Sequence, residues 1–301
     1  GCTNDPNAPF VWLGGESVTD TPDLRLLERE SGQWQQRMLV ESGEDEPLLR
    51  RCWLIEQDGN KKVFVEKYDF EPVQRKGEQI WISKYILSSY RFENNQLKLE
   101  QTAFVAESNK DSDEFDIECA SVGSDVYVWV CEEGSLYSSG KLRVAKWQND
   151  GELEWTDCYR GRKGYLLSGL TVDPSDGSAA VILPLTKGQW IPAAAVICQL
   201  RDGVAESVTI DEHFQGKTQL LRVNGGKVEW LLSGKERHTI LMLNSELQPV
   251  GEIENELSQT RNYHLVRGID GAIYIAAMTP EGELKMGKLE KFTGRQVRSK
   301  E

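Results

Sequence analysis

Short apolar runs that follow glycine turns recur along the chain and set its dominant pattern. Each run is rich in aromatic and β-branched residues, which are typical of strands. The separations between successive turns are 45 to 54 residues, and almost no stretch shows the 3.6-residue period of a helix. The turns begin at Gly32, which opens a weaker copy, Gly77, Gly123, Gly177, Gly225 and Gly271. The pattern therefore predicts a chain built from a repeated unit of β-strands.

A second turn lies inside each copy, between two further short strands. Asp-Gly and Asn-Gly pairs favour the positive φ angles of tight hairpins, so each marks an antiparallel pair. These turns are Asp58-Gly59, Asn94-Asn95, Asp150-Gly151, Asp202-Gly203, Asn244-Ser245 and Thr293-Gly294. Each copy then holds about four strands, the first of which is expected at 117–122, 165–172, 218–223 or 263–269 in the best copies. In the early copies, 24–30 suits a strand, and 69–76 makes a poor one.

Four-stranded sheets that repeat every 40–50 residues resemble the repeats of β-propellers. The resemblance predicts an all-β protein with a single β-propeller of about six four-stranded blades, five or seven remaining open. Residues 1–9 form a flexible tether and 10–301 the propeller. We expect Phe10–Leu13 to close the ring by pairing with the final blade. No WD series or kelch di-glycine appears, so the resemblance names an architecture and no particular protein.

Composition narrows the possible partners. The chain has 301 residues and a net charge of −13, which argues against nucleic acid because phosphate binding needs clustered Lys and Arg. Its 39% hydrophobic content supports a sizeable core. No apolar run approaches the roughly 20 residues that span a bilayer. A membrane contact is therefore expected only through a lipid anchor.

The six cysteines form no CxxC pair, which leaves a zinc ribbon or thioredoxin-type site without support. Cys119 and Cys131 flank a turn expected at Ser124-Asp125, and strands that pivot there hold the two residues opposite each other. That geometry predicts a disulfide, with two unpaired cysteines in a sheet as the alternative.

The amino terminus resembles that of a mature bacterial lipoprotein. Cys2 stands at the start of a polar stretch rich in Pro and Asn, and signal peptides of that class are cut just before a lipidated Cys. The resemblance implies lipidation of Cys2, a signal peptide, and a place in the bacterial cell envelope, periplasmic or outer-membrane. A cysteine near an arbitrary chain end is the alternative. An oxidising compartment would favour the disulfide.

Candidate ligand residues map to the loops that share one face of a propeller, where rigid scaffolds present variable segments. Arginines there suit anions, and the aromatic residues suit a sugar or peptide. The candidates are Tyr137, Tyr159, Arg160, Arg162, Trp190, Arg237, His238, Arg261, Tyr263 and His264. Solvated basic loops and scaffold packing are the alternatives. The three histidines lack ligand spacing, and 109–116 lacks the EF-hand pattern, so no metal or cofactor is expected.

No GxSxG, HExxH, Walker or GxGxxG motif occurs. The sequence therefore favours a non-enzymatic binding or scaffold module whose loop face contacts a protein or glycan partner. The alternative is a periplasmic or surface hydrolase or lyase that acts on an anionic carbohydrate at the channel mouth, since paired carboxylates from separate blades leave no local signature. A purely structural assembly component is a third possibility.

Overall fold

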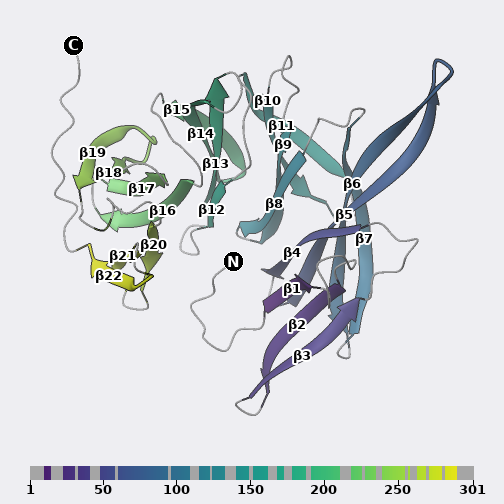
Figure 1. Ribbon diagram of the computed structural model, residues 1–301, viewed down its shortest axis with the longest axis horizontal. Coiled ribbons are helices and arrows are strands. Elements are labelled where there is room, and N and C mark those ends of the chain that lie inside the picture. Colours follow the sequence, from purple (N-terminus) through teal and green to yellow (C-terminus); the bar gives the residue numbers. More distant parts are fainter. Residues whose placement is uncertain are drawn as a thin grey trace. The chain divides into compact units, whose positions relative to one another are not determined.

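The computed structural model describes most of the chain as strands (Figure 1). The described residues are 10–14, 23–30, 33–40, 48–57, 60–93, 96–108, 115–122, 124–132, 140–148, 152–161, 168–172, 178–187, 191–210, 218–225, 228–234, 239–254, 257, 263–268, 271–279 and 282–289. They fall into two compact units. Unit 1 holds residues 1–135 and 143–156, and unit 2 holds 136–142 and 157–301.

Unit 1 contains one three-stranded sheet, one four-stranded sheet and most of a third sheet. The strands of the first two sheets are β1 (Phe10–Gly14), β2 (Asp23–Glu30), β3 (Gln33–Val40), β4 (Leu48–Gln57), β5 (Asn60–Arg75), β6 (Glu78–Glu93) and β7 (Gln96–Ser108). The third sheet is β8 (Phe115–Val122), β9 (Asp125–Glu132), β10 (Gly140–Trp147) and β11 (Leu153–Gly161). Within each sheet, strands that follow one another in sequence lie side by side.

Unit 2 contains two four-stranded sheets and a final three-stranded sheet of the same kind. Their strands are β12 (Ser168–Val172), β13 (Ala179–Lys187), β14 (Ile191–Arg201), β15 (Val204–Ile210), β16 (Thr218–Gly225), β17 (Val228–Gly234), β18 (Thr239–Leu243), β19 (Pro249–Glu254), β20 (Tyr263–Arg267), β21 (Ile273–Met278) and β22 (Leu284–Lys288). The expected all-β repeat of four-stranded antiparallel sheets is thereby confirmed. No helix in the described ranges is long and apolar enough to cross a membrane.

The first strands of successive sheets contact each other within each unit. In unit 1, β1 contacts β4 and β4 contacts β8. In unit 2, β12 contacts β16 and β16 contacts β20. Apolar side chains fill the space between neighbouring sheets, and Trp230 is fully buried there among residues of two sheets. Neighbouring sheets are thus stabilised by burial of the apolar faces that their alternating residues create.

Residues 10–14 form β1, which pairs with β2 from Phe10↔Leu27 to Gly14↔Asp23, and the expected pairing of 10–13 with the final blade stays a prediction. The expectation about the turn at Gly77 is wrong. Gly77 turns the chain between the second and third strands of its sheet, where Lys76 and Gly77 have φ angles of 52° and 84°. Asp58-Gly59 and Thr293-Gly294 lie outside the described residues.

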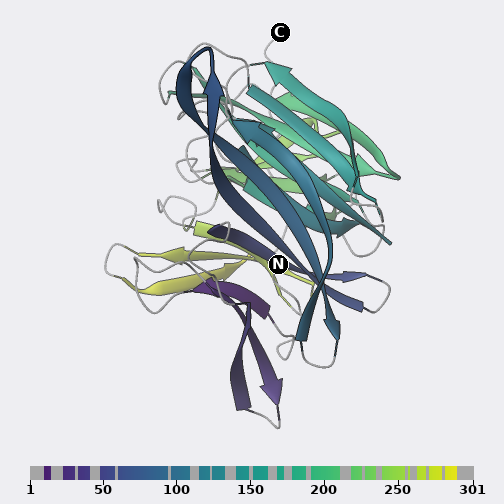
Figure 2. The same cartoon turned by 90° about the vertical axis from the view of Figure 1, so that its right-hand side faces the viewer.

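The hairpin of β5 and β6 extends beyond the rest of its sheet (Figure 2). β4 pairs with β5 only as far as Tyr68, and β7 pairs with β6 only as far as Ser83, so residues 69–82 form a two-stranded arm. Residues 69–76 were expected to make a poor strand because they were assigned to an inner position. As part of an arm they need no core on both faces. Trp81 is 53% exposed on this arm.

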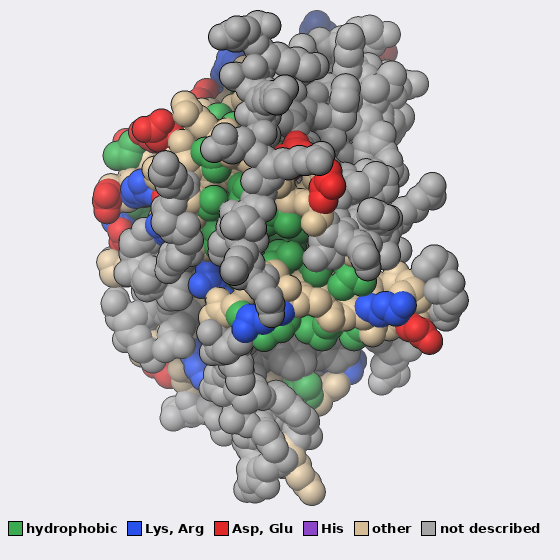
Figure 3. Space-filling model, turned by 90° about the vertical axis from the view of Figure 1, so that its left-hand side faces the viewer, with side chains coloured by type: hydrophobic (Ala, Val, Ile, Leu, Met, Phe, Trp, Pro, Cys, Tyr) green, Lys and Arg blue, Asp and Glu red, His purple; other side chains and the backbone are tan. Residues whose placement is uncertain are grey.

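Unit 2 exposes apolar side chains on its last two sheets. Hydrophobic side chains are visible among charged ones on the face shown in Figure 3. The exposed large apolar residues of these sheets are Val250, Val266, Met278, Leu284 and Met286. Among the described strands, β22 pairs with β21 alone, so its other edge carries no described neighbour.

The predicted disulfide between Cys119 and Cys131 is wrong. The β8–β9 register pairs Cys119 with Val128 and Cys131 with Asp116, so the two cysteines are offset along the ladder. No disulfide joins them. The prediction placed the pivot of the hairpin one to two residues too far along the chain, and an offset of that size separates the two sulfur atoms beyond bonding reach.

Candidate functional site

Most residues expected at the ligand site fall outside the described part of the chain. These are Tyr137, Arg162, Trp190, Arg237, His238 and Arg261, together with Cys2. Their roles, including lipid attachment at Cys2, stay predictions. The remaining four candidates are on two strands of different sheets, β11 and β20.

Tyr159 and Arg160 lie near the end of β11. The Arg160 guanidinium is 65% exposed and pairs with Asp157 at 3.4 Å between Nη2 and Oδ2. The Tyr159 ring folds over Gly161, where a Cβ would lie 2.5 Å from the phenol oxygen. An exposed pair of this kind contributes little stability, which matches the solvated basic loop weighed as the alternative.

Tyr263 and His264 lie on β20, with opposite orientations. Tyr263 is 6% exposed and packs in a core cluster with Leu265 and Ile275. His264 is exposed. The strand alternates inward and outward side chains, so these neighbours cannot share a ligand face. Burial of Tyr263 matches the scaffold packing given as the alternative, and the ligand contacts of Tyr263 and His264 stay predictions.

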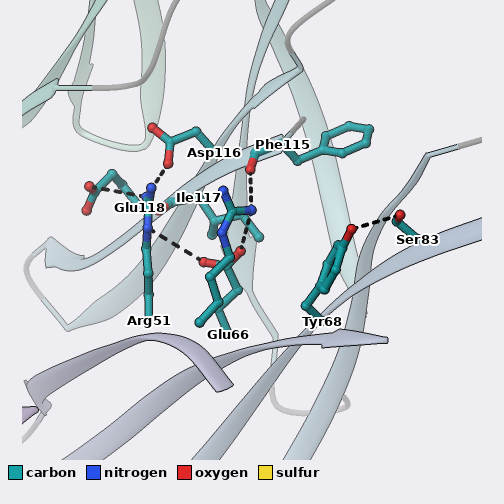
Figure 4. Close-up of polar contacts among 9 residues, drawn as sticks. Arg51, Glu66, Tyr68, Ser83, Phe115, Asp116, Ile117 and Glu118 are labelled. Carbon is teal, nitrogen blue, oxygen red and sulfur yellow. Dashed lines mark hydrogen bonds and ion pairs between the residues drawn. The ribbon is translucent and has the colours of Figure 1, made fainter. Parts of the chain in front are cut away.

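A cluster of five charged residues in unit 1 is the strongest candidate site, and sequence reasoning missed it (Figure 4). We call it the unit 1 charged cluster. Its members are Arg50 and Arg51 on β4, Glu66 on β5, and Asp116 and Glu118 on β8. Figure 4 shows Glu66 of β5 and the β8 residues Asp116 and Glu118 directed toward Arg51.

A bulge explains why two consecutive arginines reach the same carboxylate. The β4–β5 register pairs Leu49 with Lys67 and Arg51 with Glu66, so Arg50 is the extra residue between them. Regular alternation would send neighbouring side chains to opposite faces, and a bulge removes that constraint. Arg50 Nη1 lies 3.4 Å from Glu66 Oε1, and Arg51 Nε lies 3.9 Å from Glu66 Oε2.

The other two carboxylates come from one face of β8. Asp116 and Glu118 are two residues apart, which places their side chains on the same side of a strand. Arg51 Nη1 contacts Asp116 Oδ1 and lies 3.9 Å from Glu118 Oε1. Trp53 Nε1 donates a hydrogen bond of 3.2 Å to Glu118 Oε2. Arg51 therefore stands between two carboxylates, one of which also accepts a bond from an indole.

Backbone carbonyls complete the arginine contacts. Arg50 Nη1 donates to the Phe115 carbonyl at 2.9 Å, and Arg51 Nη1 donates to the Ile117 carbonyl at 3.0 Å. The Arg50 guanidinium also lies 5.6 Å from the centre of the Tyr85 ring. These contacts fix both guanidinium groups between β4 and β8. A fork held at several points presents its remaining N–H groups in a fixed direction.

The cluster is buried on one side and open on the other. Glu66 and Asp116 are 0% and 1% exposed, whereas Arg50, Arg51 and Glu118 are 31%, 30% and 26% exposed. Trp53 is half-buried beside Glu118. A ligand that approached the open edge would meet two guanidinium groups, one carboxyl and one indole ring.

Burial raises the pKa values of Glu66 and Glu118. Desolvation raises the pKa of Glu66 to about 7, against the opposing pull of Arg50 and Arg51 and with help from Asp116 and Glu118. Desolvation also raises the pKa of Glu118, which the Trp53 hydrogen bond and Arg51 partly offset. Both shifts favour the protonated form of these two carboxyl groups relative to an exposed glutamate.

The arrangement offers acid–base chemistry more readily than metal chemistry. No group of three or more metal-ligating side chains occurs in the part of the chain that the structure describes. A partly exposed carboxyl with a raised pKa, such as Glu118, beside a carboxyl that contacts a guanidinium is the pattern of a proton donor and an anionic partner. The sequence signal was Arg50-Arg51 after two leucines and Glu66 directly after the apolar run Val63-Phe64-Val65.

The comparisons with known proteins give a fold and no family. No family model and no curated protein matches the chain. An α-L-arabinanase of Penicillium chrysogenum, solved with arabinobiose, is 8% identical with a TM-score of 0.53, covering 96% of this chain and 92% of its own. The GH93 α-L-arabinofuranosidase of Fusarium graminearum, solved with arabinobiose, is 9% identical with a TM-score of 0.50, covering 89% and 85%.

A third solved structure, the Dos1 propeller, is 7% identical with a TM-score of 0.45, covering 90% of this chain and 79% of its own. The fold is that of a β-propeller. The four four-stranded sheets and the two three-stranded ones correspond to its blades, close to the number expected from the repeat. At these identities the likeness concerns the fold alone. The site of this propeller must be argued from its own residues.

Proposed function

We propose that this β-propeller is a glycoside hydrolase that acts on a neutral glycan at the open edge of the unit 1 charged cluster. One observation carries the proposal: Glu118, partly exposed and with a raised pKa, lies two residues from the ion-paired Asp116 on the same face of β8. Cleavage of a glycosidic bond by paired carboxyl groups needs one protonated and one ionised partner. The raised pKa of Glu118 and the contact of Asp116 with Arg51 support this division of roles.

The open edge has the composition of a sugar site. An indole ring presents an apolar face on which a sugar ring can stack, and Trp53 is held beside Glu118 by its own hydrogen bond. The guanidinium groups of Arg50 and Arg51 offer donors to hydroxyl oxygens. Orientation of a glycan would therefore come from β4, and the acid from β8.

The charge balance favours a neutral glycan over the anionic one that the sequence suggested. Both arginines of the cluster already contact carboxylates, and acids outnumber arginines by three to two. The whole chain carries a charge of −13. A polyanionic substrate would be repelled both by the carboxyl groups of the cluster and by the net negative charge of the whole chain. The two solved structures bound to arabinobiose, a neutral disaccharide, support the same choice as a probe.

The proposed reaction divides its proton transfers between two side chains. Glu118 donates its proton to the glycosidic oxygen as the bond to the anomeric carbon breaks. Asp116 takes a proton from the water that adds to that carbon, and the products are a hemiacetal and an alcohol. Arg51 contacts the Asp116 carboxyl group and positions it. Trp53 orients the Glu118 carboxyl.

The test is release of reducing ends from arabino-oligosaccharides by the full chain, with polygalacturonate as the anionic comparison. We expect turnover of the neutral substrate and a loss of about 100-fold to 10,000-fold in kcat on Glu118→Gln. Glu154→Gln, at an exposed glutamate of β11, is the matched control and should keep the wild-type rate. Equal turnover by wild type and Glu118→Gln would remove the assignment.

Glycan binding without cleavage is the second candidate, and burial favours it. Asp116 is 1% exposed, and Arg51 stands between Asp116 and Glu118, where a scissile bond would need room. Calorimetric titration separates the two functions. A pure binder would bind the oligosaccharide, release no reducing ends, and lose at least about tenfold in affinity on Trp53→Ala. Absence of both binding and turnover across a panel of neutral glycans would overturn both candidates.

A further inference from the structure

Two cysteines of unit 2 approach each other across a sheet face. Cys198 lies on β14 and is directly opposite Ser207 on β15 in the strand register. Side chains of directly opposed residues stand on the same face of a sheet, so the Ser207 hydroxyl and the Cys198 thiol point the same way. Cys158, on the segment of β11 that belongs to unit 2, meets this face.

The contact that positions Cys158 is a backbone one. Ser207 Oγ donates a hydrogen bond of 2.6 Å to the Cys158 carbonyl. This bond holds the Cys158 backbone against the residue that faces Cys198. The Cys158 and Cys198 thiols are themselves hydrogen-bond partners. The strand register, the Ser207 hydrogen bond and the contact between the thiols therefore all place Cys158 next to Cys198.

The two thiols differ in access. Cys198 is fully buried, and Cys158 is half-buried beside an exposed Ser207. The hydrogen bond with Cys158 and burial together raise the pKa of the Cys198 thiol well above its ordinary range. Cys158 is thus the thiol that a dissolved oxidant reaches first, and Cys198 is the one that follows.

We propose that Cys158 and Cys198 form a reversible disulfide that ties β11 to β14, and that this pair is a redox-sensitive site of the protein. The position differs from the disulfide expected between Cys119 and Cys131, whose register keeps them apart. Chain separation of the new pair is 40 residues, so the bond closes a long loop and restricts the unfolded chain.

The chemistry balances with a low-molecular-weight disulfide as oxidant. The Cys158 thiolate attacks oxidised glutathione, which forms a mixed disulfide and releases one glutathione thiolate. The Cys198 thiolate then attacks Cys158 Sγ, which forms the protein disulfide and releases the second glutathione. Two cysteine thiols are oxidised and one glutathione disulfide is reduced to two thiols. Because the pKa of Cys198 is raised, the second step should quicken by about tenfold for each unit of pH in the neutral range.

The experiment treats the full chain with oxidised glutathione and maps the products without reduction. Trypsin releases Cys158 within residues 147–160 and Cys198 within residues 188–201. We expect these two peptides to appear joined, to separate on reduction, and the thermal midpoint of the oxidised protein to rise by about 5 °C.

Single substitutions distinguish the roles of the two thiols. In Cys198→Ser, Cys158 should accumulate a glutathione adduct that is not resolved. In Cys158→Ser, Cys198 should stay reduced, and neither variant should gain thermal stability on oxidation. Cys52→Ser, which replaces another half-buried thiol, is the matched control and should still form the joined peptides. Joined peptides that are absent from oxidised wild type, or oxidation of Cys198 by glutathione in Cys158→Ser, would overturn the proposal.

Discussion

The two units each contain an arginine that reaches between sheets, but with opposite charge balance. In unit 2, Arg222 Nη2 lies 2.7 Å from Glu229 Oε1, and Arg201 Nη2 lies 2.8 Å from the same oxygen. Arg222 also contacts Ser178 Oγ and lies over the Trp230 ring, 5.4 Å from its centre. One carboxylate is shared there by two arginines. In the unit 1 charged cluster, three carboxyl groups share two arginines.

The difference shows that a cluster of arginines and carboxyl groups behaves differently when the ratio of the two groups changes. In unit 2, two guanidinium groups contact one carboxylate, and these contacts join neighbouring strands. In unit 1, burial together with Asp116 and Glu118 raises the pKa of Glu66 to about 7, against the opposing effect of Arg50 and Arg51. Titration near neutral pH, together with an open edge, makes unit 1 the place to look for chemistry.

The largest expected effect comes from Arg51→Met. Arg51 contacts Glu66, Asp116 and Glu118, so its removal leaves two buried carboxyl groups short of a cation. We expect the free energy of unfolding to fall by about 4 kcal/mol, measured by urea denaturation at pH 7. The fall should shrink at pH 5, where more of the carboxyl groups are protonated. A loss below about 1 kcal/mol would mean that the cluster is already solvated.

The substitution Glu66→Gln tests whether the pKa of Glu66 is raised in the folded state. Because the folded-state pKa of Glu66 is raised to about 7 from an ordinary 4.5, the folded state favours the protonated form. The contribution of Glu66 is fully present below pH 4.5 and is lost as the pH rises through 7. Unfolding measured from pH 4.5 to 8 should show wild type losing up to about 3 kcal/mol relative to the variant. Parallel curves for the two proteins would contradict a raised pKa.

Arg222→Met applies the matching change to unit 2. Glu229 retains Arg201 after the substitution, so the carboxylate keeps a partner at 2.8 Å. We expect a loss of about 2 kcal/mol from the broken contacts and the lost packing on Trp230, with little change between pH 5 and 8. Chemical denaturation at both pH values measures it. A pH-dependent loss as large as that of Arg51→Met would erase the contrast between the units.

The smallest effect should come from an exposed ion pair of unit 1. Arg91 Nη2 lies 2.9 Å from Glu93 Oε1, and both side chains are more than 40% exposed. Water screens such a pair, so Arg91→Met should change the free energy of unfolding by no more than about 0.5 kcal/mol in the same urea assay. A cost near that of Arg51→Met would show that burial does not govern these values.

The repeat of strands was predictable because turn chemistry is local. Asp202-Gly203 turns the chain at positive φ, as its residue types predicted, and strand 117–122 appears as β8 (Phe115–Val122). The two-stranded arm of β5 and β6 was not predictable. A hairpin turn such as that at Gly77 has the same residue pattern whether it joins the first and second strands of a sheet or the second and third. The one-to-two-residue shift of the β8–β9 register was likewise invisible, and it removed the Cys119–Cys131 bond.

The sequence indicates that the unit 1 charged cluster contains buried charged residues, but it does not show which residues pair with one another. Charged residues inside apolar strands, such as Glu66 after Val63-Phe64-Val65, indicate a buried partner. Which partner it has depends on the bulge at Arg50 and on the packing of β4 against β8, and neither leaves a pattern along the chain.

The most direct test is the titration of Glu66 itself. Carboxyl-labelled glutamate observed by 13C NMR, with the Glu66 signal identified by its absence in Glu66→Gln, reports the protonation of this one group. We expect a titration midpoint near pH 7, because burial raises the pKa of Glu66 to about 7. A midpoint near pH 4.5 would show a carboxylate fully neutralised by its two arginines, and the unit 1 cluster would then differ from its unit 2 counterpart only in composition.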